Sequence, residues 1–73
     1  METKLYLDRL LELINYKDQK DSYAKEQKWS EAAGFRELER EVLKSLNMEH
    51  PISRQDILSM IKDARIKLYL EYT

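Results

Sequence analysis

The sequence predicts an all-α protein, either a three-helix antiparallel bundle or a helical hairpin with a third helix, in one small domain of residues 1–73. Turn-forming residues are rare. The chain has only one glycine and one proline, too few for the turns of a β-rich fold. Apolar residues recur at helical spacing in three segments, which places helices near residues 3–27, 30–46 and 53–72.

The first segment, residues 3–27, carries apolar residues at positions i, i+3, i+4 and i+7 of one helix face: Leu7, Leu10, Leu11 and Ile14. Leu13 and Tyr16 widen this face. Residues 17–22 contain no apolar side chain, yet Tyr23 and Ala24 then continue the pattern. We therefore expect one continuous helix rather than two short ones.

The second helix is expected to begin at Ser30, whose hydroxyl can accept from a backbone N–H of the first turn, and to end before Asn47. Glu31 suits the positive end of the helix dipole. The apolar face is continued by Ala32, Phe35, Leu38, Val42 and Leu46. Opposite charges three residues apart are expected to pair on the remaining faces: Arg36 with Glu39, Glu37 with Arg40, and Glu41 with Lys44.

Gly34 lies inside this predicted helix, where a glycine costs about 1 kcal/mol relative to alanine. Such a cost suggests a packing role, because Ala32, Ala33 and Gly34 together form a surface of small residues. We expect the first helix to pack closely there through Tyr23 or Ala24. Gly34→Leu should then destabilise the protein.

The third helix has the clearest start signal. Ser53 and Asp56 have the spacing of a capping box, and Ile52 and Ile57 flank them as a hydrophobic staple. One face is formed by Ile57, Ile61, Ala64, Leu68 and Tyr72, whereas further apolar residues spread around the helix: Leu58, Met60, Ile66, Tyr69 and Leu70. Residues 66–72 also alternate with the period of a half-buried strand, which leaves a strand there as an alternative.

The size of the chain predicts self-association. A domain of 73 residues has a marginal core, and without cysteine it can form neither disulfides nor thiolate metal sites. The apolar residues of the third helix exceed what one face of a small bundle can bury. We therefore expect a non-enzymatic protein-protein interaction or adaptor module that forms a homodimer or binds another protein, with Tyr69 and Tyr72 as anchors.

Residues 24–37 combine small residues, a turn aromatic and an Arg-Glu pair: Ala24, Trp29, Ala32, Ala33, Phe35, Arg36 and Glu37. This pattern, within residues 10–46, resembles the UVR-type helical hairpin of a nucleotide-excision-repair helicase subunit and its relatives, over about half of the chain. Gln27, Ser30 and Glu39 depart from the family pattern. In that family the hairpin typically pairs with another copy, so the resemblance implies a protein-protein module.

Trp29 and Phe35 are explained equally well as core residues of an unrelated helical bundle. With the resemblance and the third helix taken together, the residues predicted to bind a partner are Trp29, Phe35, Arg36, Met60, Ile66, Tyr69, Leu70 and Tyr72.

The sequence points away from catalysis and from bound cofactors. His50 is the only histidine and precedes a proline, which is typical of a solvated loop residue rather than a metal ligand or catalytic base. No glycine-rich loop could cradle a phosphate, so neither a cofactor nor a small-molecule substrate is expected. The chain lacks an apolar run of signal-peptide or membrane-spanning length, and we expect it in the cytoplasm, without a membrane partner.

Nucleic-acid binding is the alternative function. The net charge is −1 and no segment is strongly basic, although the third helix carries a modest set of cations: Arg54, Lys62, Arg65 and Lys67. These residues would bind phosphates in a small regulatory protein. The explanation we favour for these residues is a solvated helix surface relieved by Asp56, Asp63 and Glu71.

Overall fold

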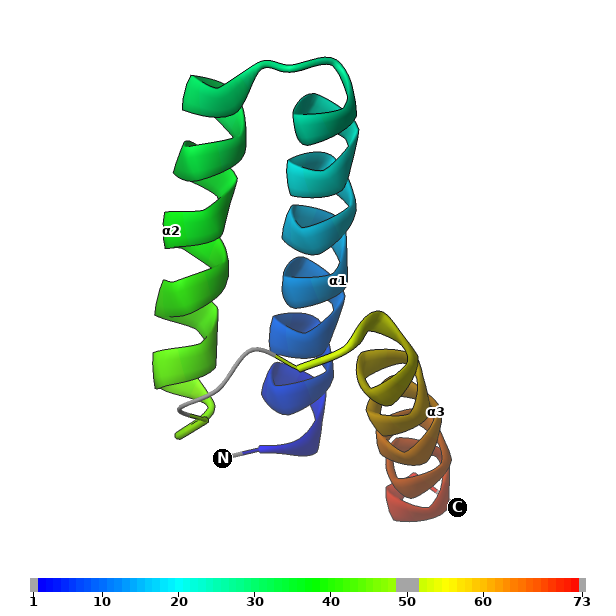
Figure 1. Ribbon diagram of the computed structural model, residues 1–73. Helices are drawn as coiled ribbons and strands as arrows, with labels where there is room; N and C mark the ends of the chain where they lie inside the picture. The colour runs from blue at the N-terminus through cyan, green and yellow to red at the C-terminus, as the bar shows by residue number, and fades with distance from the viewer. Residues whose placement is uncertain (1, 49–51, 73) are drawn as a thin grey trace.

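The computed structural model describes residues 2–48 and 52–72 and folds them into three helices, α1 (Thr3–Lys25), α2 (Trp29–Ser45) and α3 (Arg54–Glu71) (Figure 1). Every predicted helix is present, with ends within two residues of the prediction. Among the described residues there is no strand. The strand alternative for residues 66–72 is therefore wrong, because α3 remains helical to Glu71.

The helices form a hairpin with a third helix attached. α1 and α2 run antiparallel, and α3 runs opposite to α1 beside its N-terminal half (Figure 1). Side-chain contacts fix this alignment, because Arg54 at the start of α3 bonds to Asp18, whereas Glu71 at its end accepts from Thr3 at 2.6 Å. Within the described residues α2 and α3 both pack on α1 and not on each other. The molecule is elongated, about 46 × 19 × 16 Å.

The core lies along α1, which contacts both other helices. Three side chains are fully buried, one from α3 and two from α1: Ile57, Leu10 and Leu13. Leu7, Val42, Leu43, Ile61 and Ala64 complete the cluster. Met48 and Ile52 pack against it from the connection between α2 and α3. Of the residues predicted to line the apolar faces, Leu11 and Leu38 are instead more than a third exposed, because they lie at the margins of those faces.

α1 ends in a Schellman turn. The N–H of Lys28 donates to the carbonyl of Tyr23 at 2.8 Å, and the N–H of Gln27 donates to that of Ala24 at 3.0 Å. Gln27 adopts a left-handed conformation, with φ of 61°. This turn starts α2 early, so Lys28 is the N-cap residue and makes no side-chain cap. The prediction of a Ser30 cap is therefore wrong, because Ser30 already lies inside the first turn.

α2 ends in the same way. Asn47 is left-handed with φ of 58°, and its N–H donates to the carbonyl of Lys44 at 3.0 Å. The N–H of Met48 donates to the carbonyl of Leu43 at 2.9 Å. Asparagine tolerates this conformation better than most residues, and the predicted end of the helix at Asn47 is confirmed.

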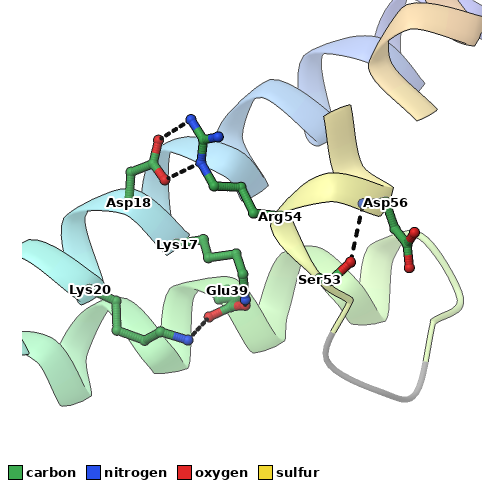
Figure 2. Close-up of polar contacts among 7 residues, drawn as sticks. All are labelled: Lys17, Asp18, Lys20, Glu39, Ser53, Arg54 and Asp56. Atoms are coloured by element: carbon green, nitrogen blue, oxygen red, sulfur yellow. Dashed lines mark hydrogen bonds and ion pairs between the residues drawn. The ribbon is translucent and has the colours of Figure 1, made fainter. Parts of the chain in front are cut away.

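The start of α3 follows its sequence signal. The Ser53 hydroxyl accepts from the N–H of Asp56 at 3.2 Å, as the capping-box spacing predicts (Figure 2). Ile57 is fully buried and Ile52 packs against the cluster that contains it, which is the placement expected of a hydrophobic staple.

Gly34 does not perform the packing role that the sequence suggests. A Cβ atom built on it would meet no atom within 4 Å, and both Ala33 and Gly34 are exposed. Only Ala32 of the small-residue surface is buried. The predicted close approach of α1 through Tyr23 or Ala24 is wrong, because the helix turns this glycine toward solvent.

Candidate interaction surfaces

The most exposed apolar side chains of α3 lie in its last two turns. We call this surface the α3 end: Ile66, Tyr69, Leu70 and Tyr72, which are 50%, 69%, 64% and 77% exposed. The sequence predicts that Ile66, Tyr69 and Leu70 exceed what the fold can bury, and their exposure confirms it. Tyr72, by contrast, was expected to be buried on the core-facing side of the helix, and that prediction is wrong. In Figure 1 the last turn of α3 extends beyond the ends of α1 and α2.

Helix geometry explains this exposure. Ile66 lies nine residues after Ile57, half a turn around the helix axis, and therefore on the side opposite the core. Tyr72 follows Leu68 by four residues and shares its core-facing side, but α1 begins at Thr3 and provides nothing further to cover it. Ile66 is thus exposed because of its side of the helix, and Tyr72 because it lies just past the end of α3.

A groove between α1 and α3 leads toward this end. Its volume is about 340 Å³ and its lining residues are Thr3, Tyr6, Met60, Asp63, Ala64 and Lys67. Met60, which the sequence predicts to bind a partner, is half buried here. Leu70 follows Lys67 by three residues on the same side of α3, so the groove and the α3 end are neighbouring parts of one surface.

The hairpin residues predicted to bind a partner lie away from the α3 end. Trp29 begins α2 at the opposite end of the molecule and is 66% exposed (Figure 1). Phe35 is half buried and stacks on Tyr23, with ring centroids 5.5 Å apart, and contacts Tyr16 at 6.2 Å. The structure therefore separates the predicted partner residues into two groups. A partner role for Trp29, Phe35 and Arg36 stays a prediction.

Glu39 is buried, contrary to the sequence prediction. Only 4% of this residue is exposed, and its carboxylate accepts from Lys20 at 2.8 Å and lies 3.7 Å from Lys17 (Figure 2). It faces α1 rather than pairing with Arg36, because it follows Phe35 by four residues on the apolar face of α2.

Of the ion pairs predicted within the second helix, one forms. Arg40 lies 3.5 Å from Glu37, as expected. Among the described residues no ion pair joins Arg36 to Glu39 or Glu41 to Lys44.

A second cavity, which we call the basic cleft, lies beside the buried carboxylate. It has a volume of about 520 Å³ and is lined by Lys20, Arg36, Glu39, Arg40, Leu43, Lys44 and Met48. Four cationic side chains and one carboxylate thus line the cleft, and Lys20 is one of the two α1 lysines that already pair with that carboxylate. Sequence reasoning missed this cleft.

Comparisons with known proteins add no relative to these observations. No family model matches the chain. No curated protein matches it, and no solved structure does. The UVR-type resemblance therefore stays a prediction, and the surfaces described above are the evidence that bears on function.

The four cations of α3 do not all lie on one side of the helix, although Arg65 follows Lys62 by three residues on a shared side. Arg54 donates to both carboxylate oxygens of Asp18, at 2.9 and 3.4 Å (Figure 2). This hydrogen bond, with the charge of Asp18, raises the pKa of Arg54 above its ordinary value. Lys67 lines the groove toward α1, whereas Lys62 lies about 140° away around the helix.

The described residues contain no group of three or more acidic or histidine side chains placed to hold a metal ion. His50 and Pro51, predicted to lie in a loop, fall outside the part of the chain that the structure describes. No helix within the described residues is long and apolar enough to cross a membrane.

Proposed function

We propose that this chain is a non-enzymatic protein-protein interaction module that self-associates through the α3 end. The observation that carries the proposal is the exposure of four large apolar side chains on two consecutive turns. Scattered apolar residues are normal on a protein surface, but a continuous group next to a groove is typical of an interface. Two of the four are tyrosines, which bury a large apolar area while the hydroxyl stays hydrated.

The total exposed area leaves surface for a second copy to cover. The chain exposes 5473 Å², whereas a compact monomer of 8.8 kDa exposes about 4,800 Å². The excess of roughly 700 Å² belongs to the whole elongated surface, and a second copy on the α3 end would cover part of it. A second copy would therefore restore part of the burial that this elongated chain lacks.

Charge around the α3 end also suits a second copy. Lys62 and Lys67 lie near Asp63 and Glu71 on the same turns, so both signs border the apolar residues. In a two-fold dimer each copy presents the same surface, and such a mixed border can pair with itself without net repulsion. A surface of one sign could not.

The experiment is sedimentation equilibrium over a concentration series, with Tyr69→Lys as the test and Trp29→Lys as the matched control. The two aromatic residues are 69% and 66% exposed but lie at opposite ends of the molecule. A lysine in the last turn of a helix is favourable, so the substitution should leave α3 intact. We expect a dimer for the wild type and the control, and a dissociation constant raised about tenfold or more for Tyr69→Lys.

Two outcomes would overturn the proposal. A wild-type chain that remains monomeric at millimolar concentration has no self-association to explain. A dimer that dissociates on Trp29→Lys but persists in Tyr69→Lys would place the interface on the hairpin, as the UVR-type resemblance implies, and not on α3.

A further inference from the structure

The basic cleft concentrates positive charge in a chain whose net charge is −1. Arg36, Arg40 and Lys44 follow one another at intervals of four residues and therefore form a row along one side of α2. Among the described residues no ion pair involves Arg36 or Lys44. Arg40 pairs only with Glu37, and both side chains are more than half exposed, so that pair is weak.

The floor of the cleft is apolar. Leu43 is buried at 7% exposure and Met48 is half buried, and the Schellman turn at the end of α2 joins them by a backbone hydrogen bond. Methionine adapts its shape readily to an incoming side chain. The cleft therefore combines a cationic rim with an adaptable apolar base, a combination that neither a purely polar nor a purely apolar ligand would use fully.

We infer that the basic cleft is a docking site for an acidic amphipathic helix of a different protein. Its carboxylates would pair with the Arg36, Arg40 and Lys44 row while a large apolar side chain enters between Leu43 and Met48. None of the lining residues belongs to the α3 end, so this interaction is separate from self-association.

Spacing favours a helical occupant. Four residues of α-helix rise about 6 Å, so the row spans about 12 Å. Carboxylates placed every fourth residue on an incoming helix have the same separation, and all three can pair at once. An extended strand would place side chains of one face about 7 Å apart and would lose register along the row. The cleft also lies between two helices, where an additional helix packs by ridges and grooves.

Protein is favoured over nucleic acid by the composition of the cleft. The floor of the cleft is apolar, so a ligand that carries only phosphates would leave Leu43 and Met48 unused. Leu43 and Met48 offer no hydrogen bond to a phosphate or a sugar, and no aromatic side chain is present among the lining residues on which a base could stack. The rim selects negative charge and the floor selects an apolar side chain.

The test uses a synthetic helical peptide with glutamates at three positions four residues apart and leucines on the adjacent face. Two matched peptides replace either the glutamates by glutamine or the leucines by serine. Binding is followed by fluorescence anisotropy at low and moderate salt, and the site is mapped by NMR on the full chain. We expect the acidic peptide to bind, to shift the signals of Leu43 and Met48 most, and to bind more weakly as salt rises.

The test variant is Arg36→Gln with Lys44→Gln, and its control is Lys4→Gln with Lys25→Gln. Both remove two exposed cations from helices, but neither control residue lines the cleft. The test variant should bind the acidic peptide about tenfold more weakly than the control. Circular dichroism should show that both variants keep the helical content of the wild type. Tyr69→Lys, which disrupts the proposed dimer, should leave peptide binding unchanged.

Several results would overturn the inference. These are no binding of the acidic peptide, equal binding of either matched peptide, or equal binding by the test variant and its control. Comparable occupation of the same residues by a thymidine oligonucleotide or by inorganic phosphate would assign the cleft to phosphates instead. Loss of self-association in Arg36→Gln with Lys44→Gln would identify the occupant as a second copy rather than a different protein.

Discussion

The two ends of this elongated molecule differ in how their aromatic side chains are packed. In the hairpin, the ring of Phe35 contacts the rings of both Tyr16 and Tyr23. At the other end, Tyr69 and Tyr72 are 69% and 77% exposed. Trp29 at the hairpin end is 66% exposed as well, so the contrast is between the aromatic contacts inside the hairpin and the tyrosines of the α3 end. The difference indicates that aromatic side chains are partly buried where two helices face each other and stay exposed elsewhere.

Between these ends lies the part of the fold that holds all three helices together. We expect Leu10→Ala to lower the free energy of unfolding by about 2–5 kcal/mol, because Leu10 is fully buried and its removal leaves a cavity. Urea denaturation, at a protein concentration that keeps the chain monomeric, would measure this loss of free energy. Leu38→Ala is the matched control, since Leu38 is 39% exposed and should cost much less. Equal losses would contradict the prediction, because they would show that the full burial of Leu10 adds no stability.

The polar contacts of the hairpin provide the next largest effect. Glu39→Gln should lower the free energy of unfolding by about 1–2 kcal/mol, because a neutral amide replaces the charge-assisted contacts with Lys17 and Lys20 inside the helix interface. Chemical denaturation compared with Glu41→Gln, an exposed glutamate on the same helix, would measure the loss. If the two variants are equally stable, the buried carboxylate contributes no stability and the hairpin depends on apolar packing alone.

The helices and one of their caps could be predicted from sequence because their signals are local. Spacing of apolar residues located all three helices, and the Ser53 hydroxyl caps α3 as its distance from Asp56 indicates. The predicted cap at Ser30 was wrong because the turn before α2 depends on Gln27, a residue type that seldom adopts a left-handed conformation. An N-cap residue can be predicted from sequence only when the preceding turn does not shift the start of the helix.

The basic cleft could not be predicted from charge counts along the chain. Arg36, Arg40 and Lys44 alternate with glutamates in sequence, so their segment carries no positive excess. Folding places these three cations in one row along α2, still bordered by Glu37, and adds Lys20 from α1. Glu39 offered a usable signal, since its spacing from Phe35 and Val42 places it on the apolar face. The exposure of Ile66, Tyr69 and Leu70 was predictable because it follows from an excess of apolar residues, whereas the exposure of Tyr72 was not.

Substitutions at Gly34 and Ala33 are expected to have the smallest effects on stability. Gly34→Ala should raise the free energy of unfolding by about 1 kcal/mol, because alanine loses less backbone entropy in a helix and its Cβ would enter open space. The reverse change next to it, Ala33→Gly, should lower the free energy by a similar amount, since Ala33 is also exposed within α2. Thermal denaturation of both variants would show opposite shifts around the wild type. A destabilised Gly34→Ala would instead mean that another chain packs closely on this side of the hairpin, because the chain itself places nothing there.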